Sequence, residues 1–306
     1  ATSFTSGANK TYADVSNDTT LSGGSTQFSS SLNAITLNTS VAAINDAPTR
    51  LISSVSLPPA AEDTQPAGSD VLTLFNSAFS DVADAVSGGS SANSFSGIAI
   101  TANTADATTM GKWQYFTSSG SSWYDILTSV STTQALLLDA NTLIRFLPAA
   151  NFNGSPAGIV ARLIDNSSAT SFTVNGSRVT ADVSNDTGLS GGITKFSSST
   201  NAVTLNTTIT PVNDAPHASS TSITMNDTAK GNSNGPGQTI SSIFSSIFTD
   251  PKDVITVGSG GSIANNFAGI AIVGNTTSNA STQGSWQYSI DGLNWSNVCL
   301  LYTSPS

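Results

Sequence analysis

The chain has 306 residues, of which only 9% are charged, against roughly 25% in an ordinary soluble protein. Nine Lys and Arg against nineteen Asp and Glu give a net charge of −10, which excludes the basic field that nucleic-acid binding requires. A single cysteine, Cys299, excludes an intrachain disulfide framework, and a single histidine, His217, leaves little for general-base or metal chemistry. We therefore expect that the protein is not an enzyme and does not bind nucleic acid.

No apolar run approaches the roughly 20 residues that span a bilayer, so no membrane insertion is expected. The sequence also shows no initiator Met, no secretion signal and no lipidation motif. We expect a segment of a longer or processed chain.

An internal repeat organises the sequence. Residues 1–48 align without a gap onto 169–216, with 31 of 48 positions identical, and the stretch after Pro48 returns more loosely after Pro216. The alignment predicts a truncated first copy (1–48), a complete middle copy (49–216) and the front of a third copy (217–306). A complete copy is long enough to bury a core of its own.

The similarity between copies stops near Val298. Residues 299–306 depart from the repeat and resemble translated adapter sequence, with a divergent repeat end as the alternative. Cys299 therefore carries no functional argument.

One predicted element of the middle and third copies is helical. Val71, Phe75, Phe79 and Val82 follow a spacing of 3.6 residues, as do the apolar residues of 240–248 in the third copy. We expect short helical turns there, capped near residues 69–70 in the middle copy and ended around Asp81 or Pro251.

The remaining elements of the copies are predicted to be strands. Residues 113–115 alternate with period two, and apolar runs bounded by turn residues follow at 135–138, 143–146, 159–164 and 202–209. In the third copy Asp291 and Gly292 predict a tight hairpin turn of type I′. Many short strands separated by polar turns predict an all-β fold of tandem β-sandwich modules, with a short helical insertion in each repeat.

Several short motifs together resemble a known family. Residues 211–216 (Pro-Val-Asn-Asp-Ala-Pro) look like the junction between tandem cadherin-like domains of very large bacterial surface proteins. Residues 146–154, 62–64 and 111–115 resemble further signatures of such modules, and 284–292 resembles the last of these again. The resemblance implies an Ig/cadherin-like sandwich, secretion, a role in adhesion or matrix, and calcium at the domain junctions.

Clustered Asp, Asn and Glu on turns supply the hard oxygen ligands that calcium takes. The candidate calcium ligands are Asn45, Asp46, Glu62, Asp63, Asp81 and Asp84 at the first junction, and Asn213, Asp214, Asp227, Asp250 and Asp253 at the second. Asn226 stands where the family motif has Glu, which weakens the expected second site. The alternative is that Asn-Asp-Ala-Pro is turn chemistry that fixes the linker.

A second polar set has the spacing Asp-x-x-Asn-Asp. It comprises Asp14, Asn17 and Asp18 in the first copy and Asp182, Asn185 and Asp186 in the middle copy. These residues are expected to be solvated turn residues, with ion binding as the alternative.

Aromatic residues on the predicted hairpins are candidates for stacking on sugars. They are Trp113, Tyr115, Trp123, Trp286, Tyr288 and Trp295. Aromatic residues that alternate along a strand more often belong to the core or to cross-strand pairs.

The leading functional hypothesis is an extracellular segment of a cadherin-like adhesin or matrix protein. It would act as an extended stalk in cell adhesion or biofilm, with Ca²⁺ stiffening the junctions and neighbouring repeats or copies of itself as partners. One alternative is a subunit of an extracellular fibre assembled through β-strand contacts. Another is a carbohydrate-binding module whose partners are surface glycans.

Overall fold

The computed structural model describes residues 10–229, 231, 235–276 and 280–298. The chain divides into two units, Ala1–Ala43 and Ile44–Ser306. The predicted change of sequence at 299–306 lies outside the described residues. No described helix has both the length and the apolar character needed to cross a bilayer.

The described part of the first unit consists of turns and one short 3-10 helix, η1 (Ser31–Asn33). Asp18 organises it by accepting hydrogen bonds from the Oγ of Ser22 (2.6 Å) and the backbone N–H of Ser31 (2.8 Å). No strand occurs among the described residues of this unit.

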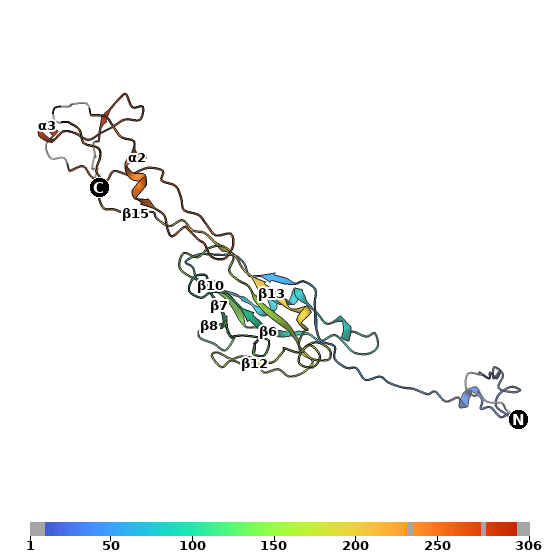
Figure 1. Ribbon diagram of the computed structural model, residues 1–306. Coiled ribbons are helices and arrows are strands. Elements are labelled where there is room, and N and C mark those ends of the chain that lie inside the picture. The colour runs from blue at the N-terminus through green and yellow to red at the C-terminus, as the bar shows by residue number, and fades with distance from the viewer. Residues whose placement is uncertain (1–9, 230, 232–234, 277–279, 299–306) are drawn as a thin grey trace, which may run out of the picture. The chain divides into compact units, whose positions relative to one another are not determined.

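The middle copy is built mostly of strands, with a few short helices (Figure 1). Its elements are β1 (Thr49–Arg50), β2 (Ser54–Ser56), β3 (Ala60–Ala61), β4 (Ser69–Asp70), α1 (Val71–Phe75), η2 (Asn76–Ala78), β5 (Phe79–Ser80), η3 (Val82–Asp84), β6 (Phe95–Asn103), β7 (Gly111–Phe116), β8 (Tyr124–Asp125), β9 (Ala135–Asp139), β10 (Leu143–Pro148), β11 (Ile159–Asp165), β12 (Thr180–Ala181), η4 (Ser199–Asn201), β13 (Val203–Asn206) and β14 (Ile209–Thr210). The predicted all-β character is confirmed.

Two sheets contain most of these strands. One has four strands in the order β4-β10-β7-β8, and the other has six in the order β12-β9-β6-β11-β13-β2. Neighbouring strands are antiparallel except for β13 with β2, which run parallel. A separate parallel pair joins β3 to β14, so residues near the start of the middle copy lie beside residues at its end. The predicted strands at 113–115, 135–138, 143–146 and 159–164 are confirmed as β7, β9, β10 and β11.

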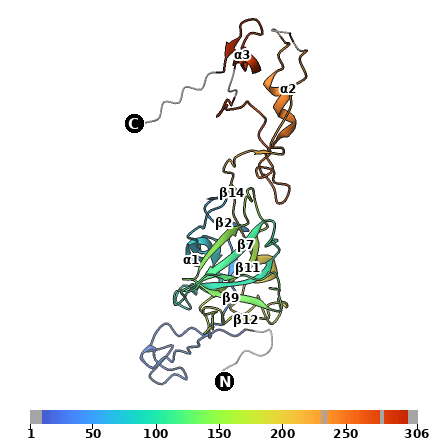
Figure 2. The ribbon, with the colours of Figure 1, turned by 90° about the vertical axis from the view of Figure 1, so that its left-hand side faces the viewer.

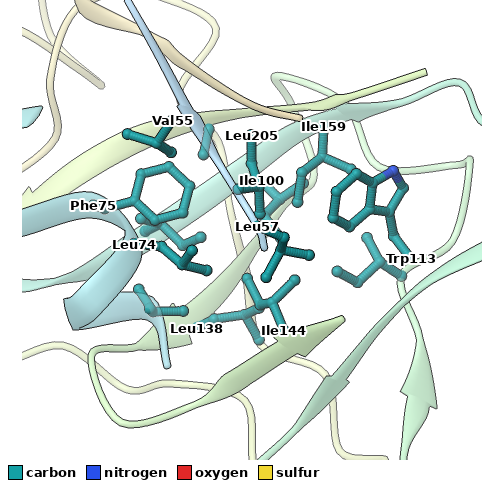
Figure 3. Close-up of a cluster of buried hydrophobic side chains, with 14 of the residues drawn as sticks. Val55, Leu57, Leu74, Phe75, Ile100, Trp113, Leu138, Ile144, Ile159 and Leu205 are labelled. Carbon is teal, nitrogen blue, oxygen red and sulfur yellow. The ribbon is translucent and has the colours of Figure 1, made fainter. Parts of the chain in front are cut away.

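One hydrophobic core receives side chains from both sheets (Figure 3). Trp113 of β7 is fully buried, meets the ring of Phe146 of β10 edge-on at 5.3 Å, and donates its Nε1–H to the carbonyl oxygen of Ala157 at 2.8 Å. From the six-stranded sheet, Ile100 and Leu205 enter the same cluster. Burial of this apolar area is the main stabilising contribution to the middle copy.

The predicted helical segment of the middle copy is shorter than its apolar spacing indicates. The carboxylate of Asp70 caps α1 by accepting the N–H of Thr73 at 2.7 Å, as expected. The α-helix ends at Phe75, and after η2 the chain enters β5 because Phe79 pairs with Arg50 of β1. Figure 2 shows α1 beside the strands, and it packs against β6 and β2.

The third copy repeats the beginning of this arrangement. Its elements are β15 (His217–Ala218), α2 (Ile240–Phe244), η5 (Ser245–Ile247), β16 (Phe248–Thr249), α3 (Ala280–Gln283), β17 (Gln287–Tyr288) and β18 (Ser296–Asn297). The pairing of β15 with β16 has the same register as that of β1 with β5. Residues at equivalent positions in the two copies therefore pair in the same way.

The predicted type I′ turn at residues 291–292 is wrong. Gly292 has a positive φ of 73°, but Asp291 does not, and the turn requires both. Instead, the Asp291 carboxylate accepts the N–H groups of Leu293 and Asn294 at 2.9 and 2.8 Å, so a longer loop joins β17 to β18.

Candidate functional site

The first junction holds a cluster of hydrogen-bonded polar side chains centred on Asn93, in which Asp81 and Asp84 are buried. The Nδ2 of Asn93 donates to Oδ1 of Asn45 (2.8 Å) and to Oδ2 of Asp84 (2.7 Å). Its backbone N–H donates to Oδ2 of Asp81 (2.5 Å), and the N–H of Asp46 donates to Oδ1 of Asp84 (2.9 Å). The side chains of the linker and of the loop after β5 therefore share one network.

Asp165, at the end of β11, adds a third carboxylate to this environment. It is fully buried, and its Oδ1 accepts the N–H of Ser167 at 2.8 Å while its Oδ2 has no hydrogen-bond partner. The Oδ1 of Asp81, a residue only 5% exposed, is also without a partner. Burial raises the pKa of both carboxyl groups, and the charge of Asp81 raises the pKa of Asp165 further. Two buried carboxylate oxygens without donors favour a proton or a cation.

The second junction repeats the network with Asn265 at its centre. The Nδ2 of Asn265 donates to Oδ1 of Asn213 (2.9 Å) and Oδ2 of Asp253 (2.8 Å), and its N–H donates to Oδ2 of Asp250 (2.7 Å). The N–H of Asp214 donates to Oδ1 of Asp253 at 3.1 Å. The Oδ1 of Asp250 is buried without a partner, like that of Asp81.

The strand pairing explains why both networks form. Each linker leads directly into a short strand, β1 or β15, that pairs with β5 or β16. Asp81 and Asp250 follow those second strands immediately, so the pairing brings them to the linker that precedes the first strand. The two junctions therefore have the same hydrogen-bond geometry because the two copies have similar sequences at these positions.

The assignment of Glu62 and Asp63 to the first junction is wrong. Glu62 is buried, and its carboxylate accepts the N–H of Val212 (2.5 Å) and the Nδ2 of Asn153 (3.1 Å). Asp63 accepts the N–H of Asn151 at 2.9 Å. The parallel pairing of β3 with β14 places this segment beside the linker that follows β14, which is the second junction.

Asn153 extends the second junction toward the third copy. Its Nδ2 donates to Oγ of Ser262 (2.8 Å) and its Oδ1 accepts the N–H of Ser262 (2.7 Å). The Oγ of Ser262 donates in turn to the carbonyl oxygen of Asp253 at 2.6 Å. Asp227, the remaining candidate, is exposed, and no hydrogen bond among the described residues joins it to this network.

Sequence reasoning missed Asn93 and Asn265, and it interpreted Asp165 as an ordinary turn cap at a strand end. A signal existed for the first two, because Ala-Asn recurs shortly before the Phe-x-Gly-Ile-Ala-Ile segment in both copies, at 92–93 and 264–265. Asp165 has no described equivalent in the third copy, and its position at a strand end resembles an ordinary turn cap.

Comparison with known proteins adds no further information. No family model, curated protein or solved structure matches the chain. Among the residues that the structure describes, no group of three or more His, Cys, Asp or Glu side chains is placed so that it could hold a metal ion. A cation at either junction would therefore take amide or backbone oxygens as well as carboxylates as ligands.

The Asp-x-x-Asn-Asp set forms turns. Asp182 and Asn185 accept the N–H groups of Ser184 (2.9 Å) and Thr187 (2.8 Å). Both carboxylate oxygens of Asp186 accept hydrogen bonds from Ser199. In the middle copy the Asp182 carboxylate is used within its own loop, whereas Asp186 also lies 3.6 Å from Nη1 of Arg162 of β11.

Two of the aromatic candidates of the middle copy, Trp113 and Tyr115, are not available for stacking on sugars, whereas Trp123 is half-buried. Trp113 and Tyr115 are fully buried, and the hydroxyl of Tyr115 donates to the carbonyl oxygen of Asn175 at 2.9 Å. One face of Trp123 is covered by the guanidinium of Arg145, 4.0 Å from the ring centroid. The proposed ligand-binding role of Trp113 and Tyr115 is therefore wrong, because β7 directs both rings into the core. In the third copy Trp286, Tyr288 and Trp295 are exposed.

Without a bound cation, the stability of the middle copy is expected to fall as the pH rises above about 3.8, the ordinary pKa of Asp. Asp81 and Asp165 have raised pKa values when folded, so the native state binds more protons than the unfolded state in this window. Urea denaturation in chelator at a series of pH values measures the effect. An Asp81→Asn, Asp165→Asn double variant is expected to have a flatter profile, and an unchanged profile would contradict the assignment.

Proposed function

We propose that this chain is a segment of an extracellular, cadherin-like stalk made of β-sandwich modules joined end to end, with Ca²⁺ at the junctions. The single observation that carries the proposal is the same polar network at both linkers, with a buried, unpartnered aspartate oxygen in each. The tandem repeat and the short motifs of the linkers support the same conclusion.

Calcium suits the chemistry of the first junction. It takes six to eight oxygen ligands from carboxylates, amides, carbonyls and water. The unpartnered oxygens of Asp81 and Asp165 would supply carboxylate ligands, and Asn45 would supply its amide oxygen. The ion would supply the positive charge that the two unpartnered oxygens lack.

The mechanical role follows from where the ligands come from. Asn45 and Asp46 belong to the linker, whereas Asp81 and Asp84 belong to the following module. A cation shared between them would restrict rotation of the linker, and a series of such junctions would make the chain extended and stiff. Sites of this kind in extracellular modules have dissociation constants of roughly 10⁻⁴ to 10⁻³ M, which suits an environment with millimolar calcium.

Thermal unfolding with calcium and with a chelator tests this function. At a calcium concentration 100 times the dissociation constant, binding to the native state alone adds about 2.7 kcal/mol to the free energy of unfolding. We therefore expect a higher midpoint in calcium than in chelator, with magnesium at the same concentration as the control for ionic strength. An unchanged midpoint would exclude calcium at these junctions.

A further inference from the structure

A pocket of about 380 Å³ lies within the middle copy and shares no lining residue with either junction network. Leu57 and Phe146 line it and belong to the core cluster, where Figure 3 shows Leu57. Pro58, Pro59 and Pro66 also line it. Small-molecule sites have volumes of roughly 300–1,000 Å³ and mostly apolar walls. The pocket therefore has the size and the wall of a site for a small organic molecule.

Strand pairing and proline residues hold the walls of this pocket in place. Its wall includes two segments, 57–60 and 64–69, and each is fixed by a strand pair, β3 with β14 and β4 with β10. Because proline fixes its own φ, Pro58, Pro59 and Pro66 restrict both segments further. The pocket is therefore formed before a ligand binds, which lowers the entropic cost of binding.

Arg145 of β10 adds a positive charge to the apolar wall. The residue is only 8% exposed, and its Nη1 donates to the carbonyl oxygen of Pro66 at 3.2 Å, so the guanidinium lies at the pocket. Its Nε donates to Oε1 of Gln114 at 2.9 Å, and its Cζ lies 4.0 Å from the centroid of the Trp123 ring. Its Nη2 has no hydrogen bond among the described residues. The guanidinium is thus fixed in position with one nitrogen left to donate.

The charge of Arg145 also lacks a counter-ion. Among the residues that the structure describes, no carboxylate forms an ion pair with it, whereas Arg162, the other buried arginine, lies 3.6 Å from Asp186. Burial lowers the pKa of both arginines, but a carboxylate opposes this effect only at Arg162. Since a buried charge without a counter-ion is unfavourable, the pocket favours an anionic group beside Arg145.

We propose that this pocket binds a small carboxylate with an apolar body, such as an aromatic acid. The carboxylate accepts hydrogen bonds from Nη2 of Arg145, and the apolar body contacts Leu57, Phe146 and the prolines. A sugar acid fits less well, because its hydroxyl groups would lose their water against an apolar wall. The site lies outside the junction networks, so it does not depend on the calcium proposal.

Ligand-observed fluorine NMR with the full chain tests the site, with para-fluorobenzoate as the probe and the neutral para-fluorobenzamide as the control. We expect the carboxylate to bind about tenfold more tightly than the amide or better, because a hydrogen bond between charged groups is stronger than a neutral one. Absence of binding, or equal affinities of the two probes, would overturn the proposal. Glucuronate that displaces the probe at a lower concentration than benzoate would overturn the apolar body of the ligand.

Two substitutions test the location. Arg145→Gln is expected to weaken the binding of para-fluorobenzoate by about tenfold or more. Because this change also alters the packing against Trp123, Ala67→Trp provides a second variant: Ala67 is exposed and lines the pocket, so an indole there should abolish binding without disturbing the core. Ala107→Trp, at an exposed turn that does not line the pocket, is the matched control. Binding that survives Ala67→Trp, or that Ala107→Trp removes equally, would overturn the site.

Discussion

Replacement of Trp113 with alanine is expected to lower the free energy of unfolding of the middle copy by about 3–5 kcal/mol. The indole is fully buried, packs edge-on against Phe146, and donates its N–H to Ala157. The substitution leaves a large cavity and also an unpaired carbonyl oxygen. Because small domains have a total stability of about 5–15 kcal/mol, the loss is a large fraction of the whole. Urea denaturation followed by far-ultraviolet circular dichroism measures it.

Trp286 provides a matched control for this prediction. It occupies the equivalent place in the third copy but is 56% exposed. Trp286→Ala is therefore expected to change the stability by less than about 1 kcal/mol, as for surface substitutions in general. Equal losses from the two substitutions would show that the third copy buries its tryptophan as the middle copy does.

Much of the strand content could be predicted from sequence because the core strands have strong local signals. Residues 135–138 and 159–164 are apolar runs bounded by turn residues, and both are strands in the central part of the six-stranded sheet. The end of the helix was harder to predict. The helical apolar spacing continues through Phe79, but in the structure Phe79 is a strand residue that pairs with Arg50. The end of the helix is therefore set by a pairing between residues far apart in the sequence, and a local pattern gives no information about such a pairing.

The candidate site shows the same limit more clearly. Asp81 and Asp84 could be selected because their spacing recurs as Asp250 and Asp253 next to a recurring linker. Glu62 was placed at the wrong junction because it follows Pro48 of the first linker by fourteen residues and resembles a motif near the start of a module. The parallel pairing of β3 with β14 carries it to the other junction, and nothing in the local sequence predicts that pairing.

Asp165→Asn is expected to change the stability in opposite directions with and without calcium. In chelator, the substitution removes a fully buried carboxyl group whose ionisation is disfavoured by burial and by the neighbouring Asp81, so the free energy of unfolding should rise. In calcium, the substitution removes a carboxylate ligand. A tenfold weaker site gives about 1.4 kcal/mol less stabilisation at saturating calcium.

The opposite signs separate a metal ligand from a structural residue. A residue that only supports the fold would lose stability in both conditions, whereas a ligand loses only the calcium-dependent part. Asp106→Asn is the control within the same copy, because Asp106 is exposed and its Oδ1 accepts the N–H groups of Thr108 and Thr109, which an asparagine oxygen can also accept. Thermal midpoints of the three proteins in calcium and in chelator decide the matter. An equal loss of stability for Asp165→Asn in calcium and in chelator would show that Asp165 is not a ligand of the site.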